Sequence, residues 1–531
     1  MINRLVRSVA NNVLMRLYRS EHQLFTSLAS GDQLAHLQEQ KLLHLLQKNR
    51  ETRFGREHRL DTIVSVEDYQ RKVPISLYED FAPYIERIAS GSAAELTAEA
   101  VLLFELSSGS VTASKMIPYT KSLQEEFQAG IKPWLYDLYQ SFPKLRQSQS
   151  YWSVTPVGQQ QRCTEGGIPI GFEKDSEYLG GVVQSLYRVL LPVPDSVAHL
   201  SSNEEFRWQT AIGLLQADQL GLISVWNPTF LLLLLDYMSA EAAALSKELT
   251  KRRVKRGEEL LGVLQQKDYA AVWPDLQVIS CWADASAARY AGELQALFPG
   301  VALEPKGLLA TEGFMSLPFV GEDGARLAYR SHFFEFSSCD DQRLYLAHQL
   351  QEGVRYRILL TTGGGFYRYA IGDIVEVRGF SGGLPRLVFI GKGDKVSDRF
   401  GEKLHEVFVE EALQQLVGEL QINPDFMMLA FAEDRYLLFL QCADLLRSQA
   451  EVLHRRLDEA LQANFHYAYC RRLRQLEPAG LFLCDGDARA SYLQACVAQG
   501  QRLGDIKPVA LHLGDSWGDI FHGQRYNQGE C

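Results

Sequence analysis

Apolar positions along this chain follow two patterns: short continuous runs, which predict strands, and repeats at helical spacing, which predict helices. Four short apolar runs have the composition of buried strands, at residues 101–106, 222–226, 276–282 and 301–304. Between them, Pro228-Thr229-Phe230 opens a strongly apolar helix, and Ala285 to Leu297 repeats apolar residues at helical spacing. Because the order strand, helix, strand recurs, we expect an α/β fold built on a doubly wound or mixed sheet.

The last part of the chain has its own set of elements. Strands are expected at residues 427–431, 436–440 and 481–484, and helices at 446–463 and 488–499. The glycine-containing run Gly391 to Asp398 precedes them and marks a boundary. We therefore expect a large N-terminal mixed α/β domain over residues 1–393 and a smaller C-terminal α+β domain over residues 394–531.

The first twenty residues have a basic amphipathic pattern in which Leu5, Val9 and Val13 are interrupted by arginines. A helix on a membrane surface and a helix docked on the protein's own core both fit this pattern, and docking is favoured. The most apolar run, Phe230 to Leu235, is far shorter than a bilayer requires. No membrane span is therefore expected.

Composition narrows the class of partner. The 531 residues are 46% hydrophobic and 22% charged, which is typical of a globular protein with room for more than one domain. The formal net charge of -11 opposes binding to a phosphate backbone. The densest basic run, Lys251 to Arg256, is followed by Glu258 and Glu259, as on a solvated helix face. Nucleic acid is not expected as a partner, and the oligomeric state is unknown from sequence.

The eight cysteines are scattered and include no CxxC pair. They form neither a disulfide framework nor a zinc-binding pattern. Reduced thiols in a cytoplasmic protein are the simplest interpretation.

The candidate chemistry begins where the first predicted strand ends. Small and hydroxylated residues follow it, and then a lysine: Ser107, Ser108, Gly109, Ser110, Thr112 and Lys115. Backbone N–H groups near Gly109, the hydroxyls and the Lys115 ammonium can converge on one polyanion. This stretch alone is equally compatible with a Ser-rich surface turn and a solvated lysine.

Downstream, Ser122 and Glu125 have the spacing of a helix cap, so the predicted order is strand, loop, helix. The loop is not the P-loop of nucleoside triphosphatases. The one Gly-Lys pair, Gly391-Lys392, has no glycine five positions earlier and no Ser or Thr after it.

Two later stretches also place polar groups beside predicted strands. Thr311-Glu312-Gly313 follows a strand, where ligands of open α/β sheets gather, although alone it fits an ordinary turn. The run Thr361 to Val377 follows the strand-like Phe333 to Phe336 and contains three successive glycines before Asp373. Glycines allow close backbone approach, and a carboxylate there can accept hydrogen bonds from both ribose hydroxyls. A hairpin turn with a solvated aspartate is the alternative.

In their order and spacing, these motifs resemble the adenylate-forming superfamily, in the variant found in the auxin-responsive acyl acid amido synthetases, the Gretchen Hagen family. Ser107-Ser108-Gly109-Ser110 with Lys115 and Pro118 looks like the first family motif. Plant members usually carry Thr where Ser110 stands and a further glycine before the lysine. The shorter loop of this chain resembles the prokaryotic branch, and the match spans roughly residues 50 to 510.

The resemblance implies a large domain of adenylate-forming type and the cofactors ATP and Mg²⁺. It implies a nucleotide site made of Ser107, Ser108, Gly109, Ser110, Thr112, Thr311, Glu312, Tyr367 and Asp373. Within it, Glu312 is also the metal ligand and Asp373 binds the ribose. Lys115 and Lys507, the latter followed by Pro508, match catalytic lysines, and Asp394 resembles the hinge acid before the mobile C-terminal domain.

The implied reaction joins a small carboxylic acid to the amine of an amino acid through an acyl adenylate, releasing pyrophosphate and AMP. Trp152 and the run Gly166 to Phe172 are expected to border the acyl site. Three alternatives remain open: a thioester-forming ligase that uses coenzyme A, a ligase that uses a different nucleophile or none, and an inactive nucleotide-binding protein of the same fold. The sequence names neither the acid nor the amine.

One further motif points to different chemistry. Gly379-Phe380-Ser381-Gly382-Gly383 matches the GxSxG pattern of serine hydrolases. It lies between two strand-like runs with no helix after it, so it predicts a hairpin rather than a nucleophile.

Overall fold

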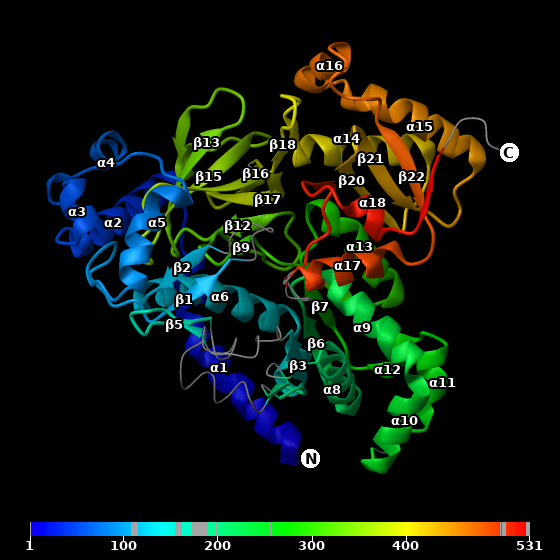
Figure 1. The fold of residues 1–531 in the computed structure, drawn as a ribbon. Helices are drawn as coiled ribbons and strands as arrows, with labels where there is room; N and C mark the ends of the chain where they lie inside the picture. Colours follow the sequence, from blue (N-terminus) through cyan, green and yellow to red (C-terminus); the bar gives the residue numbers. More distant parts are fainter. Residues whose placement is uncertain are drawn as a thin grey trace. The chain divides into compact units, whose positions relative to one another are not determined.

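The computed structural model of this chain describes residues 2–107, 115–153, 162–171, 190–194, 196–197, 200, 202–254, 256–393, 395–499, 501 and 506–526. The chain divides into two compact units. The first comprises Met1–Ile371 and Val375–Phe389, and the second comprises Gly372–Ile374 and Ile390–Cys531. The fold is mixed α/β, as expected (Figure 1).

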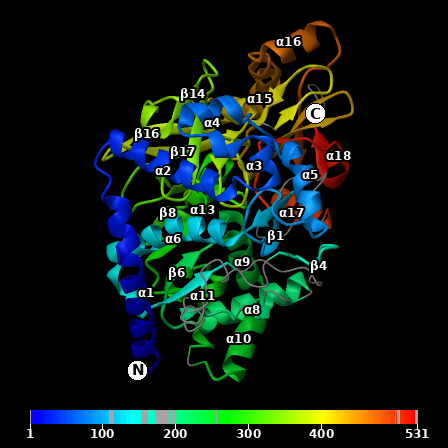
Figure 2. The same ribbon diagram turned by 90° about the vertical axis from the view of Figure 1, so that its left-hand side faces the viewer.

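The N-terminal part of the first unit is helical. It contains α1 (Ile2–Thr26), α2 (Gly31–Asn49), α3 (Arg53–Glu57), α4 (Val66–Lys72) and α5 (Tyr78–Ala89). One face of α1, with Ala10, Leu14 and Tyr18, is buried, and the helix packs along α6 (Lys121–Ser141), as Figure 2 shows. The expected docking on the protein's own core is thus observed for that face, while Leu5 and Val9 on the other face stay exposed.

A parallel sheet forms the second layer of this unit. Its strand order is β3 (Gln149–Trp152), β6 (Leu220–Ser224), β7 (Val278–Cys281) and β8 (Ala302–Pro305), with every neighbouring pair parallel. The connecting helices are α8 (Asn203–Gln216), α9 (Pro228–Ala240), α10 (Ala242–Lys251), α11 (Glu259–Gln265), α12 (Tyr269–Val272) and α13 (Ala288–Leu297). Three of the four predicted strands lie here. Strands β6 and β7 are fully buried and have the continuous apolar runs that such strands need, whereas β8 lies at the sheet edge and is only partly buried.

The fourth predicted strand, β1 (Leu103–Leu106), belongs to another sheet, of order β2 (Met116–Tyr119), β1, β5 (Pro169–Ile170) and β4 (Arg162–Cys163). β2 pairs antiparallel with β1, so the local order is strand, loop, strand, helix and not strand, loop, helix. The predicted cap at Ser122 is also wrong. Thr120 is the N-cap of α6, because its extended backbone lets its hydroxyl accept a hydrogen bond from the Leu123 N–H at 3.1 Å.

The largest sheet has the order β11 (Ser316–Leu317), β12 (Ala325–Leu327), β17 (Leu384–Lys392), β16 (Tyr369–Ser381), β15 (Arg355–Thr361), β13 (Phe333–Ser338) and β14 (Leu344–Leu346). A separate hairpin pairs β9 (Leu309–Ala310) with β10 (Gly313–Phe314). The GxSxG segment ends β16 and forms the turn to β17 at Gly382 and Gly383, which have positive φ, so the hairpin prediction is confirmed.

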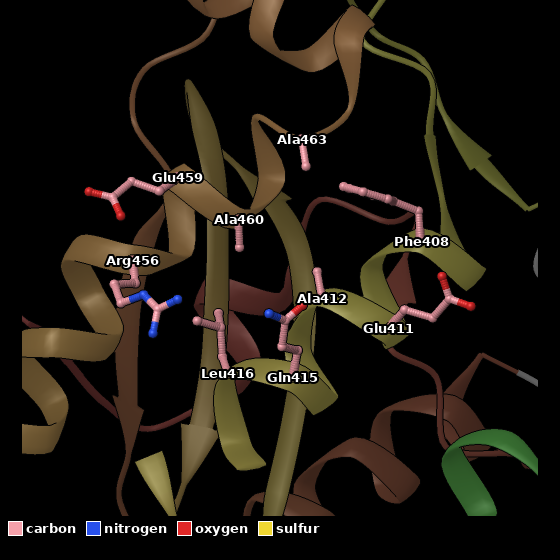
Figure 3. A pocket seen from close by; sticks show the side chains of 9 residues that line it. All are labelled: Phe408, Glu411, Ala412, Gln415, Leu416, Arg456, Glu459, Ala460 and Ala463. Atoms are coloured by element: carbon pink, nitrogen blue, oxygen red, sulfur yellow. The ribbon is translucent and has the colours of Figure 1, made fainter. Parts of the chain in front are cut away.

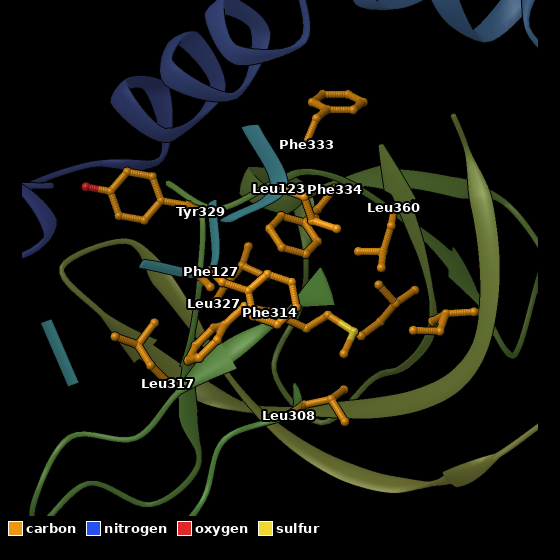
Figure 4. Packing of buried hydrophobic residues seen from close by; sticks show 14 of the residues in the cluster. Leu123, Phe127, Leu308, Phe314, Leu317, Leu327, Tyr329, Phe333, Phe334 and Leu360 are labelled. Atoms are coloured by element: carbon orange, nitrogen blue, oxygen red, sulfur yellow. The ribbon is translucent and has the colours of Figure 1, made fainter. Parts of the chain in front are cut away.

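Buried side chains from α6, the β9–β10 hairpin and the largest sheet form one continuous core in the first unit (Figure 4). Phe127 of α6 meets Phe314 of β10 edge-on, with ring centroids 6.3 Å apart. Since this core fixes α6 against the hairpin, it also positions the polar residues that these elements carry.

The second unit has its own sheet and core. The strand order is β23 (Leu511–His512), β20 (Phe426–Ala432), β21 (Arg435–Gln441), β22 (Gly480–Cys484) and β24 (Gly523–Arg525). Its helices are α14 (Glu406–Leu420), α15 (Arg447–Leu461), α16 (Phe465–Arg472), α17 (Ala488–Ala498) and α18 (Trp517–Ile520), and a short hairpin pairs β18 (Val396–Ser397) with β19 (Leu404–His405). The three strands and two helices predicted for this region are all confirmed within one or two residues of their ends.

Candidate active site

Three residues from distant parts of the chain meet in the first unit: Lys115, Glu312 and Tyr369. The Lys115 ammonium donates a hydrogen bond to the Tyr369 hydroxyl at 3.2 Å, and that hydroxyl donates to Glu312 Oε1 at 3.4 Å. Thr311 Oγ1 donates to the other carboxylate oxygen, Glu312 Oε2, at 3.0 Å. Lys115 directly precedes β2, Thr311 and Glu312 form the tip of the β9–β10 hairpin, and Tyr369 begins β16.

Burial and aromatic contacts shape the electrostatics of this cluster. Glu312 and Tyr369 are buried, while Lys115 is half-buried with its ammonium 5.5 Å from the ring centre of Tyr78 and 5.8 Å from that of Tyr369. Burial is the main cause that raises the pKa of Tyr78, and the nearby Glu312 carboxylate adds to it. The Tyr369 hydroxyl therefore bridges the lysine and the carboxylate at a place partly shielded from water.

The ends of the predicted phosphate loop are held together. The Ser107 N–H donates to the Lys115 carbonyl at 3.0 Å, and Ser107 Oγ accepts from the Lys115 N–H at 3.3 Å. The Tyr78 hydroxyl accepts from the Met116 N–H at 2.8 Å and so fixes the start of β2. Ser108, Gly109, Ser110 and Thr112 lie outside the described residues.

The three-glycine segment packs against the start of α6. A Cβ on Gly363 would lie 2.6 Å from the Cβ of Ser122, and Gly365 has a φ of +101°. The Gly363 carbonyl also accepts a hydrogen bond from Thr120 Oγ1 at 2.9 Å. The glycines are thus needed for close packing inside the protein, whatever they do for a ligand.

Tyr367 and Asp373, predicted in the same motif, have different surroundings. The Tyr367 ring is fully buried and stacks on Phe54 with centroids 4.4 Å apart, and its hydroxyl donates to the Leu96 carbonyl at 2.8 Å. The hydroxyl of Tyr367 is therefore engaged in the core, and its predicted nucleotide contact stays a prediction.

Asp373 lies on β16, where its carboxylate is buried and its Oδ1 is 2.9 Å from the Lys392 ammonium on β17. This contact is an ion pair within the second unit. A carboxylate has several acceptor positions, so a buried one can also accept from a hydroxyl donor.

In the second unit, Lys507 is exposed, and its carbonyl accepts a hydrogen bond from the Tyr492 hydroxyl at 3.0 Å. Asp394 lies outside the described residues. The roles predicted for Lys507 and Asp394 stay predictions.

Sequence reasoning missed Tyr369, Tyr78 and a buried pair behind the site. Tyr369 lies in the predicted motif Thr361 to Val377, but the local pattern does not distinguish it from Tyr367. The pair is His332 and Glu126, whose side chains join at 2.9 Å. Neither residue stands in a motif, so no local signal could have found it.

Three profiles of one family match the chain in order. The GH3 family N-terminal domain matches residues 29–303, the central domain residues 326–392 and the C-terminal domain residues 404–512. The chain belongs to the GH3 family. The GH3 matches cover most of its length and include Ser107, Lys115, Tyr367, Asp373 and Lys507, whereas Thr311 and Glu312 lie between the first two matched ranges.

Curated relatives and a solved structure agree with this assignment. Indole-3-acetic acid-amido synthetase GH3.2 of Arabidopsis thaliana is 22% identical over 432 residues, which cover 71% of this chain and 77% of that protein. Indole-3-acetic acid-amido synthetase GH3.10 of the same plant is 23% identical over 506 residues, covering 82% and 84%. The structure of AtGH3.15 acyl acid amido synthetase in complex with 2,4-DB has a TM-score of 0.82 at 18% identity and covers 95% of each chain, so this GH3 protein has the same fold.

Metal-ligand clusters and membrane-spanning helices are two further features that would bear on the function of this GH3 protein. Among the described residues, no three His, Cys, Asp or Glu side chains cluster so as to hold a metal ion. Within the same residues no single helix is long and apolar enough to cross a membrane, although α9 and α10, bent by 78°, pass that test as a pair.

A groove of about 390 Å³ lies between α14 and α15 in the second unit (Figure 3). Its lining mixes Phe408 and Leu416 with charged groups such as Glu411 and Arg456. It contains none of the predicted site residues, so the pairing of Lys115 with Glu312 remains the stronger candidate for chemistry.

Proposed function

We propose that this GH3 protein is an ATP-dependent acyl acid amido synthetase, which adenylates a small carboxylic acid and transfers the acyl group to the amine of an amino acid. The family assignment and the fold support an acid–amino acid ligase. The observation that carries the proposal is the convergence of Lys115, Glu312 and Tyr369 from three separate motifs.

The reaction requires activation because a carboxylate is a poor electrophile. Attack of a carboxylate oxygen on the α-phosphorus of ATP forms an acyl adenylate and breaks the bond to pyrophosphate, which leaves. The amine nitrogen then attacks the acyl carbon, AMP leaves, and the amine loses a proton. Both steps place extra negative charge on oxygen in the transition state, so fixed cationic groups accelerate them.

Lys115 is suited to the phosphate side of this reaction. Its ammonium is held by Tyr369 beside the loop 107–115, whose ends are closed by the Ser107–Lys115 hydrogen bonds. In this role Lys115 binds phosphate oxygens, and Tyr369 orients the ammonium without removing its charge.

Mg²⁺ fits the same place. The ion usually takes only one or two protein carboxylates and completes its shell with water and substrate phosphates, so a three-residue cluster is not required. Glu312, with the Thr311 hydroxyl beside it, would hold the ion. Bound there, Mg²⁺ would neutralise phosphate charge.

The remaining roles concern the ribose and the C-terminal domain. Asp373, whose buried carboxylate is paired with the Lys392 ammonium, would accept the ribose hydroxyls. Lys507 would enter the site as residues 394–531 move as a domain about Asp394, relative to residues 1–393. Its exposure in the second unit leaves the ammonium accessible for such a contact.

The substrates would be a small carboxylic acid and an amino acid. The curated relatives GH3.2 and GH3.10 are named for indole-3-acetic acid, which makes aromatic acids the first class to examine. We place the protein in the cytoplasm, in keeping with the seven described cysteines, all of which carry free thiols.

The test is acid-dependent release of pyrophosphate from Mg-ATP over a panel of aromatic, indolic and aliphatic acids, each with and without mixed amino acids. Products are identified by mass spectrometry. Release that increases with an amino acid and yields an amide supports the proposal and names both substrates. Glu312→Gln serves as the inactive control, because it removes the carboxylate charge but keeps the side-chain size.

Other outcomes favour the alternatives. If coenzyme A, and no amino acid, gives the acyl product, the protein is a thioester-forming ligase. If ATP binds but no acid releases pyrophosphate, the protein binds nucleotide without catalysis.

A further inference from the structure

Lys306 is buried at the edge of the parallel sheet and surrounded by tryptophans. Its side chain is 6% exposed. The ammonium lies 4.9 Å from the ring centre of Trp134, 5.5 Å from that of Trp152 and 4.9 Å from that of Trp226. We call these four residues the Lys306 cage. No sequence motif pointed to Lys306.

The cage stands where all four parallel strands end. Trp152 is the last residue of β3, Ser224 the last of β6 and Cys281 the last of β7, while Lys306 directly follows β8. The carboxyl ends of parallel strands form the edge at which α/β sheets ordinarily bind ligands. Placement in the fold therefore marks the cage as a ligand position.

The partners of the Lys306 ammonium among the described residues are three tryptophan rings and one hydroxyl, with no carboxylate within ion-pair distance. The ammonium donates to Ser224 Oγ at 2.7 Å. An ammonium has three donors, and within the described part of the chain this hydroxyl is the one hydrogen-bond acceptor in contact with it. Burial, opposed only weakly by Cys281, lowers the pKa of Lys306 to about 7. A buried donor left unpaired is costly, so a site of this kind gains by receiving an oxygen from a ligand.

The walls of the cage specify the shape of that ligand. Trp134 and Trp152 meet edge-to-face with centroids 5.9 Å apart, and Trp226, which is 41% exposed, forms the side toward solvent. Flat indole faces pack best on a flat apolar body. An aromatic ring bearing an oxygen substituent satisfies both the walls and the lysine.

The cage is also near the proposed reaction centre along the chain. Thr311 follows Lys306 by five residues, and even a fully extended chain of that length spans no more than about 18 Å. For the cage to act on the acid, one molecule must reach both places, with its carboxylate near Glu312 and the far end of its ring at Lys306. The cage would contact the end of the acid away from the reacting carboxylate.

We infer that the Lys306 cage is the specificity site for the acid substrate, and that it selects an aromatic carboxylic acid carrying a ring hydroxyl or an equivalent oxygen. This inference rests on the proposed function and deepens it. A hydroxyl can accept from the ammonium or donate to the neutral amine, so the contact forms in either protonation state of Lys306. Sites built to bond a hydroxyl reject analogues that lack it, since the buried donor is then left unpaired.

The test compares 4-hydroxyphenylacetate with phenylacetate, and 4-hydroxycinnamate with cinnamate. Binding is measured without ATP by quenching of tryptophan fluorescence, because three tryptophans line the site. Pyrophosphate release is measured in parallel. We expect the hydroxylated member of at least one pair to bind tenfold or more tightly to the wild-type protein. In Lys306→Met the ratio of the two affinities should fall to about one. Lys251 is exposed at the end of α10, so Lys251→Met should leave the ratio unchanged.

Equal binding of both members of each pair to the wild type, or a ratio preserved in Lys306→Met, overturns the inference. If the ratio is present in binding but no acid releases pyrophosphate, the cage stands and the proposed function fails. Should Lys306→Met not fold, Trp226→Ala replaces it. This variant removes only the half-exposed wall and should weaken binding of the hydroxylated acid at least fivefold; unaltered binding would contradict the role of the cage.

Discussion

His332 and Glu126 form a buried pair that joins two of the three motifs. His332 Nδ1 donates to Glu126 Oε2 at 2.9 Å, while its Nε2 accepts from the Phe314 N–H at 2.9 Å, which fixes the neutral tautomer. The same Oε2 accepts from the Gly363 N–H at 2.8 Å. The pair therefore ties the hairpin that carries Glu312 to the glycine turn before Tyr369.

Removing the carboxylate of Glu126 should destabilise the first unit. Burial alone would raise the pKa of Glu126, but Lys41 and His332 outweigh it and hold the pKa below its usual value, so the group is a buried anion. Glu126→Leu leaves His332 and Gly363 without an acceptor, and we expect a loss of about 3–5 kcal/mol in the free energy of unfolding, measured by chemical denaturation. Glu125→Leu, on the exposed side of α6, should change it by less than about 0.5 kcal/mol. Equal losses in both variants would contradict the role of the pair.

Lys115→Ala should reduce pyrophosphate release on the order of 10²–10³-fold, because it removes a fixed charge from the phosphate side of the transition state. Thermal stability should change little, since Lys115 is half-buried and contributes no core packing. Lys121→Ala, a few residues away and exposed, is the matched control. Activity within threefold of wild type in Lys115→Ala would remove Lys115 from the reaction.

Tyr369→Phe and Tyr367→Phe should separate catalysis from packing. Tyr369 bonds Lys115 and Glu312, so loss of its hydroxyl should lower the rate tenfold or more with a small effect on stability. Tyr367 donates to the Leu96 carbonyl in the core and also has a side-chain hydrogen bond with Asn49, so its variant should lose about 1 kcal/mol of stability and keep its rate. The comparison needs initial rates and denaturation curves of both variants; the reverse pattern would assign the ligand contact to Tyr367.

Lys507→Ala tests the contribution of the second unit. We expect adenylation to fall at least a hundredfold while ATP binding, measured by calorimetry, stays within about threefold, because this lysine would act on the reacting groups and not on the nucleotide as a whole. Arg455→Ala, an exposed cation on α15, serves as the control. A parallel loss of binding and rate would make Lys507 a nucleotide-binding residue instead.

Lys306 should also make stability depend on pH. Its pKa falls from 10.5 to about 7 on folding, chiefly through burial, so between these values the unfolded chain binds more protons than the folded one. The free energy of unfolding of the wild type, relative to that of Lys306→Met, must therefore rise with pH across this window. The rise is up to about 1.4 kcal/mol per pH unit. Cys281 opposite has its pKa raised to about 12 and does not titrate there. Denaturation of both proteins at pH 7, 8 and 9 checks this, and a constant difference would contradict it.

Local pattern predicted the elements of this chain well. The strand at residues 276–282 and the helix at 285–297 appear as β7 and as α13 with a short turn before it, because burial on a sheet or a helix face imposes its period on neighbouring residues. The motifs likewise led to Lys115, Glu312 and the family. Errors arose where two equivalent residues compete nearby, as when Thr120 and not Ser122 caps α6.

The sequence by itself determined the class of fold, the order of the elements and the family to which the chain belongs. Tertiary structure alone decided which side chains meet. Arg368 has a φ of +48°, which breaks the strand alternation and directs Tyr367 into the core and Tyr369 to Lys115. His332 meets Glu126, and Lys306 meets three tryptophans spread from residue 134 to residue 226, because packing joins segments far apart in the chain and leaves no local pattern that records it.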